Sequence, residues 1–168
     1  DTGVFQYSCT SPRTMEIAAE LMRKGIDGSN IIDKTYYEKT YIQNQILGRA
    51  LLESMLILDK RCIVSVIRKR SMEFFHAKPS DLEGIVSQLR LTKGVEVAMF
   101  LHETETHKFK VSLRSKGKVD VSRIAQYFGG GGHARAAGVT MQGSSHDVIN
   151  NITEQIELQL NREAGEEK

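Results

Sequence analysis

Two adjoining segments near the middle of the chain, VEVAMFLHE (95–103) and HKFKVSLRS (107–115), constrain the fold most. The first is almost continuously apolar, as in a central strand that is covered on both faces. The second alternates strictly between apolar and polar residues. One side of this strand carries Phe109, Val111 and Leu113, and the other carries Lys108, Lys110, Ser112 and Arg114. The segment ETETH between them predicts a turn. A sheet with helices packed on it accounts for both patterns.

The segments around this pair predict alternating helices and strands. CIVSVIRK (62–69) has the pattern of a strand, and KPSDLEGIVSQLRL has that of a helix capped by Pro79 with Ser80 or Asp81. A helix from Val119 to Phe128, a strand at AAGVTM and a last helix from about Ser145 follow. The inner stripe of the last helix contains Val148, Ile149, Ile152, Ile156 and Leu160. This order predicts an α/β domain over 61–162, with a mixed β-sheet of about five strands and flanking helices.

The first third of the chain reads as helical. RTMEIAAELMRKG has the spacing of a helix that Ser11 or Thr14 caps and Gly25 ends. An apolar stripe from Tyr36 to Leu58 predicts one long helix, so 36–60 is expected to connect residues 1–35 to the α/β domain. At the other end, 163–168 is expected to be a disordered tail.

The segment YFGGGGHARAAG (127–138) contains four consecutive glycines, Gly129–Gly132. Such a run can be a flexible surface loop. It can also place neighbouring backbone N–H groups around a phosphate, with no side chain in the way. The run has neither the Lys-Ser/Thr of a P-loop nor the strand and helix that flank a dinucleotide-binding glycine motif. A phosphate site would therefore use backbone amides and one positioned side chain.

Two side chains are candidates to complete such a site. His133 directly follows the glycines and can donate a hydrogen bond to a phosphate oxygen, although a lone histidine is often a packing or surface residue. Arg114 lies on the polar side of its strand, where its guanidinium can hold a phosphate or remain solvated. Arg135 is as compatible with solvent as with a ligand. His102 and His107 flank a turn and indicate no function.

Composition limits the remaining possibilities. Lys and Arg total 23 and Asp and Glu 21, so a net charge of +2 gives no global case for nucleic-acid binding. Cys9 and Cys62 lack metal-ligand spacing and suit a reducing compartment. No apolar run approaches the roughly 18 residues of a membrane span. We therefore expect a soluble, cytoplasmic protein without membrane contacts.

VSLRS followed by VDVSRIAQYFGGGGHARAAG resembles the C-terminal substrate-binding domain of the DHH phosphoesterase superfamily. The opening DTGVFQYS resembles the last metal-binding motif of the catalytic domain in the same family, and it suggests that the chain starts inside a folded protein. The subgroup that it resembles most is the bacterial oligoribonuclease and 3′-phosphoadenosine-5′-phosphate (pAp) phosphatase type.

This resemblance implies a hydrolase with two manganese ions in an N-terminal domain and a nucleotide-binding C-terminal domain. By position, Asp1 would be a metal ligand. Substrate phosphates or sugar would contact Arg114, Ser115, Gly130, Gly131, Gly132 and His133. The expected substrates are short oligonucleotides or pAp.

The sequence lacks the Asp-His-His motif of the family and any earlier Asp-x-Asp motif. We therefore expect this chain to be catalytically inactive by itself while it keeps a nucleotide-binding surface. Two alternatives remain: a non-catalytic nucleic-acid-binding or dimerisation module, related to the C-terminal domain of alanyl-tRNA synthetases, and a cyclic-dinucleotide phosphodiesterase of the same superfamily. The apolar stripe of the Tyr36–Leu58 segment also makes a homodimer possible.

Overall fold

The computed structural model describes residues 2–7 and 9–166, with residues 163–166 described by their backbone alone. The chain divides after Thr40 into two compact units. Among the described residues, none of the helices is both long and apolar enough to cross a membrane.

The first unit contains the helices α1 (Pro12–Arg23) and α2 (Gly28–Ile32) and a π-helical turn, η1 (Asp33–Tyr37). Helix α1 confirms the predicted helix and both of its predicted caps. Ser11 Oγ accepts from the backbone N–H of Thr14, and Thr14 Oγ1 accepts from that of Ser11, both at 3.2 Å. Gly25, with φ of +90°, ends the helix. None of these three helical segments buries a side chain.

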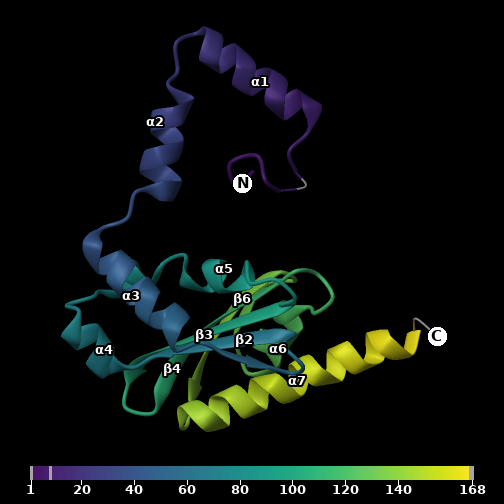
Figure 1. Ribbon diagram of the computed structural model, residues 1–168. Helices are drawn as coiled ribbons and strands as arrows, with labels where there is room; N and C mark the ends of the chain where they lie inside the picture. Colours follow the sequence, from purple (N-terminus) through teal and green to yellow (C-terminus); the bar gives the residue numbers. More distant parts are fainter. Residues whose placement is uncertain (1, 8, 167–168) are drawn as a thin grey trace. The chain divides into compact units, whose positions relative to one another are not determined.

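The second unit is built on one six-stranded sheet (Figure 1). Its strands are β1 (Met55–Ile57), β2 (Cys62–Ile67), β3 (Val97–Glu105), β4 (Lys108–Ser115), β5 (Gly131–His133) and β6 (Ala136–Gln142). They lie in the order β1-β2-β3-β4-β6-β5. Only β2 and β3 are parallel, and every other neighbouring pair is antiparallel. The expected mixed α/β fold is confirmed.

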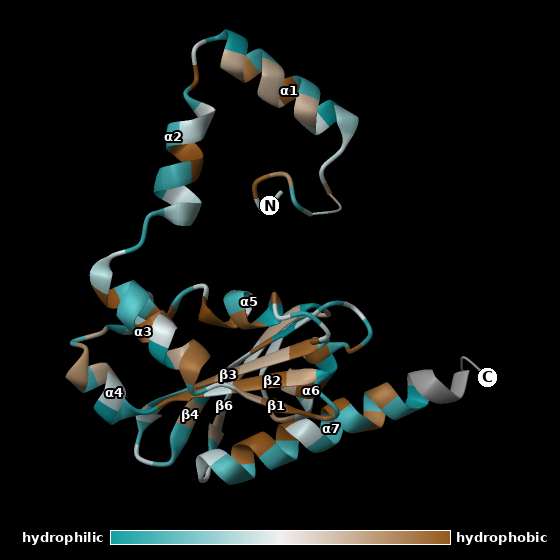
Figure 2. Cartoon of the chain, viewed as in Figure 1, coloured by the Kyte–Doolittle hydropathy of each residue, from teal (hydrophilic) through white to brown (hydrophobic). Residues whose placement is uncertain are grey.

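Helices cover the two faces of this sheet unequally (Figure 1). One face packs on α6 (Val121–Tyr127) and α7 (Ser145–Glu166) and contains the larger core. The other face packs on α3 (Tyr41–Leu52), the 3₁₀ turn η2 (Pro79–Leu82) and α5 (Ile85–Arg90). A short helix, α4 (Lys69–Phe74), follows β2. In Figure 2, hydrophobic residues concentrate on the strands and in bands along α7.

The two cores follow the alternation of the strands. On the α6/α7 face, Phe109, Val111 and Leu113 of β4 are at most 1% exposed, as the alternating pattern predicts. The inner residues Val148, Ile152 and Ile156 of α7 pack against the same face. On the opposite face, the core contains only residues of β2 and β3 among the strands, such as Ile63 and Phe100. The predicted two-sided burial of β3 is thus confirmed.

The predicted long helix from Tyr36 to Leu58 is wrong. Helix α3 ends at Leu52, and Met55–Ile57 form the edge strand β1, which pairs with β2. Three consecutive residues with positive φ, Leu58, Asp59 and Lys60, make the turn between these strands. The pairing edge offered by β2 is a tertiary feature, which the helical spacing of the local sequence does not reveal.

Two further boundaries differ from the predictions. The helix expected to begin at Pro79 is divided, because Gly84 has a φ of +85° and separates η2 from α5. Asp81 still acts at its start, where its carboxylate accepts from the N–H of Lys78 at 2.7 Å. Helix α7 continues to Glu166, into the segment that was expected to be a disordered tail.

Candidate functional site

The first two glycines of the run end helix α6. Gly129 has a φ of +82°, its N–H donates to the carbonyl of Gln126 at 3.0 Å, and the N–H of Gly130 donates to that of Ala125 at 2.7 Å. These two bonds form a Schellman motif, which satisfies carbonyls at a helix C-terminus. The prediction that the run presents a series of free amides is therefore wrong for these two positions.

Close packing explains two of the glycines. A Cβ on Gly130 would collide with the carbonyl of Gly138, and a Cβ on Gly132 would collide with the backbone of Ala136 and Ala137. Gly131, in contrast, faces open space. The last two glycines and His133 form the edge strand β5 (Gly131–His133), which pairs with β6. The glycine run therefore ends helix α6 and begins a closely packed strand. It is not the flexible surface loop that the sequence allowed as an alternative.

The register of the sheet brings Arg114 and His133 onto one face. Arg114 pairs with Ala136 across β4 and β6, and Ala136 pairs with His133 across β6 and β5. Directly paired residues in an antiparallel sheet project from the same face, and neighbouring strands are about 4.8 Å apart. Arg114 and His133 therefore flank Ala136, about 10 Å apart across two strand spacings.

The surface between these two side chains is nearly free of side chains. Ala136 separates them in their own row, and the next row pairs Ser112 with Gly138 and Gly138 with Gly131. These rows lie on the α3/α5 face, beyond the part that the core of Ile63 and Phe100 occupies. We call this region, formed by β4, β6 and β5, the open face. A guanidinium and an imidazole beside a flat backbone surface suit a planar or anionic ligand.

A groove of about 570 Å³ continues from Arg114 along β4. From the sheet, its lining includes Phe100, His102, Lys110, Ser112 and Arg114. Residues between Pro79 and Val86 form the opposite wall. The antiparallel register places His102 directly opposite Lys110. No function was predicted for His102 from the sequence, because only the register of the β3–β4 hairpin shows that it shares a face with Arg114.

Lys110 and Arg114 make the sheet side of this groove positively charged. Burial and then the nearby charge of Lys110 lower the pKa of the His102 imidazole below its usual 6.5, so the ring is neutral at pH 7. Its ring also stacks on Phe100, with ring centroids 6.3 Å apart. Arg114 is oriented by a bond from its Nη1 to the carbonyl of Leu113 at 2.9 Å.

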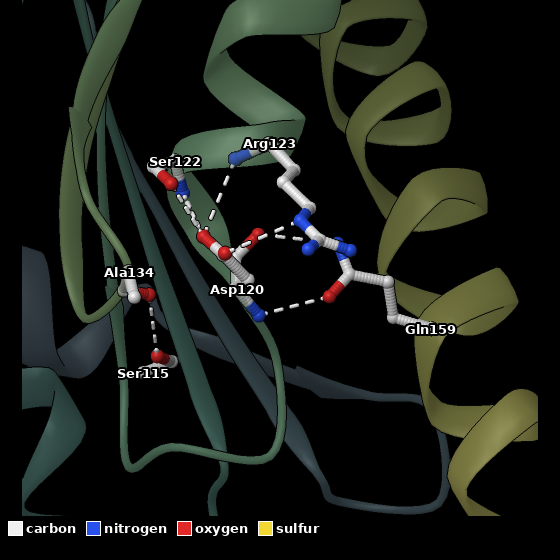
Figure 3. A network of polar contacts seen from close by, with 6 residues as sticks. All are labelled: Ser115, Asp120, Ser122, Arg123, Ala134 and Gln159. Atoms are coloured by element: carbon white, nitrogen blue, oxygen red, sulfur yellow. Dashed lines mark hydrogen bonds and ion pairs between the residues drawn. The ribbon is translucent and has the colours of Figure 1, made fainter.

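Ser115 lies on the other face of the sheet. It follows Arg114 directly in the strand, so its side chain projects to the α6/α7 side, where it is fully buried. Its Oγ donates to the carbonyl of Ala134 at 3.3 Å, as Figure 3 shows, and its N–H donates to that of Arg135 at 3.1 Å. The structure therefore places Ser115 where it holds the β5–β6 turn, away from the surface on which it was expected to contact substrate.

The turn that follows His133 is held from two sides. The carbonyl of Ala134 also accepts from the N–H of Val121, at the start of α6, at 2.9 Å. Arg135, the other turn residue, lies over the backbone of Gly117, where a Cβ would come within 3.3 Å of its guanidinium. Packing of Arg135 against this loop favours a structural role for that side chain.

The start of α6 is itself fixed by a polar network (Figure 3). Asp120 caps the helix, and its Oδ1 accepts from Ser122 Oγ at 2.5 Å and from the N–H groups of Ser122 and Arg123. The hydrogen bond from Ser122 and those from the backbone lower the pKa of the Asp120 carboxyl. The amide of Gln159 in α7 bonds both the N–H and the carbonyl of Asp120. This network ties α6, and with it the glycine run, to α7.

The loop before α6 contains a backbone amide nest, but a side chain of the protein fills it. The Glu96 carboxylate accepts from the N–H groups of Gly117 at 2.9 Å and Lys118 at 2.7 Å. Concave sets of backbone N–H groups bind anions in this way. This nest therefore stabilises the loop between β4 and α6.

The described residues do not form a metal centre. Within 2–7 and 9–162, no group of three or more His, Cys, Asp or Glu side chains is placed to hold a metal ion. Asp1, the predicted metal ligand, lies outside the described residues. The described residues therefore do not provide the ligands for a pair of manganese ions.

Comparison with known proteins shows the family of this chain. The DHHA1 domain family matches residues 59–162, which include both Arg114 and the glycine run. The chain belongs to the DHHA1 domain family. The predicted resemblance to the DHH-associated substrate-binding domain is thereby confirmed.

Two relatives of this DHHA1 chain have the same name. It is 28% identical to the bifunctional oligoribonuclease and PAP phosphatase NrnA of Thermus thermophilus, over 96% of this chain and 48% of that protein. It is 26% identical to the protein of the same name in Bacillus subtilis, over 84% of this chain and 44% of that protein. The chain thus spans about half the length of these relatives.

A solved structure confirms the fold at higher similarity. The chain superimposes on an exopolyphosphatase-related protein from Bacteroides fragilis with a TM-score of 0.86 at 30% sequence identity. The match covers 93% of this DHHA1 chain and 46% of that protein.

Proposed function

We propose that this chain is the nucleotide-binding part of a phosphoesterase that acts on short oligonucleotides or on pAp. Membership in the DHHA1 family and the names of the relatives support this substrate class. The observation that carries the proposal is the placement of Arg114 and His133 on one face, on either side of Ala136.

The chemistry of these groups favours a phosphate. The guanidinium of Arg114 can bind two phosphate oxygens at once, and the imidazole of His133 can donate to another. The flat floor at Ala136, Gly138 and Gly131 lets a ribose or a base lie against the backbone. In this proposal the chain's own residues bind and orient the substrate and stabilise charge that develops on the phosphoryl group.

We further propose that hydrolysis requires residues outside this chain. The family resemblance implies two manganese ions, and the described residues offer no group of ligands for them. The chain alone is then expected to bind nucleotides without hydrolysing them. The first unit, whose helices bury no side chain, would belong to the catalytic domain of a longer protein. The predicted cytoplasmic location remains part of this proposal.

Binding measurements on the 168-residue chain test the site. Isothermal titration with pAp and with diadenylate, in the presence of a chelator, should show binding by the wild-type chain. Arg114→Ala and His133→Ala should each weaken binding by about 1–3 kcal/mol, the cost of a lost charge-assisted contact.

The matched control is Arg135→Ala, which removes a cation that packs on the Gly117 loop. Its affinity should stay within twofold of the wild type. Unchanged affinity in both site variants would contradict the proposed site. Manganese-dependent hydrolysis of diadenylate by the purified chain would contradict its proposed inactivity.

A further inference from the structure

The groove along β4 extends well beyond the region between Arg114 and His133. Lys110, Ser112 and Arg114 occupy alternate positions of one strand, so all three project from the same face. Alternate residues of a strand are about 7 Å apart, so the backbones of Lys110 and Arg114 are about 14 Å apart. Side chains that leave the strand in parallel at this spacing hold their charges too far apart to share one phosphate group, whereas a chain of nucleotides can reach both.

The shape of the groove favours a linear ligand. Lys110, Ser112 and Arg114 line one continuous groove of about 570 Å³, which the residues from Pro79 to Val86 close on the other side. The exposed Lys110 ammonium lies at its far end, and the hydroxyl of Ser112 lies between the two cations. A hydroxyl between two cations can hydrogen-bond a phosphate or a ribose.

His102 gives this far end a second feature. It pairs with Lys110 across the hairpin and stacks on the buried Phe100, so its ring is held in place. A neutral, fixed ring at the groove wall provides a surface on which a base can stack irrespective of sequence. The far end of the groove thus offers a cation for a phosphate beside a ring for a base.

We propose that Lys110 forms a second phosphate subsite, which binds an oligonucleotide whose neighbouring part rests at Arg114 and His133. This inference rests on the proposed function and makes it more specific. The subsite distinguishes chains of several nucleotides from a mononucleotide such as pAp, whose two phosphates share one ribose. Lys110 is thus a specificity-determining residue for substrate length.

The test compares two ligands on the 168-residue chain, again in a chelator. Fluorescence anisotropy would follow binding of a labelled pentaadenylate, and competition with it would give the affinity for pAp. Lys110→Gln should weaken pentaadenylate binding about tenfold, because a charged contact is lost. It should also reduce the slope of log K against log salt by about 0.7, the value for one phosphate contact on a single strand. Affinity for pAp should change less than twofold.

Two variants serve as controls. Lys110→Arg keeps the charge and should retain both affinities. Lys60→Asn removes one lysine from the β1–β2 turn, at the sheet edge opposite β5, and asparagine tolerates the φ of +66° there. It should change neither affinity nor salt slope.

Each other result has a defined meaning. If Lys110→Gln weakens the binding of both ligands equally, or of neither, the second subsite is refuted. Arg114→Ala still tests the first subsite in that case. Absence of binding to both ligands by the wild-type chain, or wild-type affinity in both Arg114→Ala and His133→Ala, contradicts the proposed function itself.

Discussion

Arg114 and His133 project from the same face of the sheet, and only Ala136 lies between them in their row. They come from strands that the helix α6 and the glycine run separate in the sequence. Their relation depends on β6, which pairs with both of their strands. The residues that fix β6 and the turn before it therefore control the geometry of the site as much as the two ligand-binding candidates do.

Ser115→Ala and Arg114→Ala together test whether Ser115 stabilises the fold, as a positioning residue does, while Arg114 contacts the ligand. The substitution removes a buried hydroxyl that bonds the carbonyl of Ala134, so it should reduce the free energy of unfolding by about 1 kcal/mol. Arg114→Ala should leave this free energy within about 0.5 kcal/mol of the wild type, as expected for a partly exposed side chain. Urea denaturation measures both. A stability loss in Arg114→Ala that exceeds the loss in Ser115→Ala would reverse these assignments.

Gly130→Ala and Gly131→Ala form a matched pair within the run. A Cβ on Gly130 would collide with the backbone of β6, whereas a Cβ on Gly131 meets open space. We expect Gly130→Ala to destabilise the domain by about 2 kcal/mol, as overpacking does, and Gly131→Ala to change stability by less than about 0.5 kcal/mol. Thermal unfolding by circular dichroism would show the difference. Equal melting temperatures in the pair would refute the close approach of β5 to β6.

Asp120→Ala should destabilise the protein in a pH-dependent way. The carboxylate caps α6, and the loss of such a cap costs about 1 kcal/mol. Because folding lowers the pKa of Asp120 from 3.8, its charged form stabilises the fold above that pH, and this contribution is lost as the pH falls through the folded-state value. The stability difference between variant and wild type should therefore shrink below pH 3.8 in denaturation curves. A difference that stays constant down to pH 2 would argue against the cap.

The pKa of His102 should rise when the charge of Lys110 is removed. Burial is the larger cause of the lowered pKa, and the charge of Lys110 is the second. In Lys110→Gln the pKa should therefore move toward 6.5 without reaching it, because burial persists. Histidine NMR titration of the wild type and the variant measures this change. An unchanged His102 titration would show that the two side chains do not face each other across the hairpin.

The two cysteines should differ strongly in reactivity. Neither forms a disulfide, and Cys9 is exposed whereas Cys62 is fully buried in β2. Burial raises the pKa of Cys62 to about 12, so almost no thiolate forms at pH 8. A thiol reagent should modify one cysteine rapidly in the native chain and both in denaturant. Mass spectrometry of peptides would locate the modified residue, and rapid native labelling of Cys62 would contradict the core described for β2.

The sequence predicted those features that depend on local periodicity. The alternation of β4 predicted which of its residues are buried, and Ser11 and Gly25 predicted the start and the end of α1. The same alternation also implies that Arg114 and Ser115 project to opposite faces. That signal was available, but the family resemblance grouped the two residues because they are neighbours in the motif.

Features that depend on pairing between distant segments could not be predicted in this way. The strand β1 exists because β2 offers an edge, although its own sequence continues a helical stripe. His102 joins the groove because the β3–β4 register places it opposite Lys110. The glycine run looked like an anion nest, and only the contacts of Gly129 and Gly130 show that it ends a helix.

The carbonyl of Ala134 accepts hydrogen bonds from both Ser115 and Val121, so the β5–β6 turn is anchored through its main chain. The side chain of Ala134 is exposed and takes no part in this main-chain anchoring. Substitutions at this position can therefore accumulate while His133 keeps its place. Next to the proposed phosphate contact of His133, this turn gives the protein a position at which ligand preference can diverge without loss of the fold.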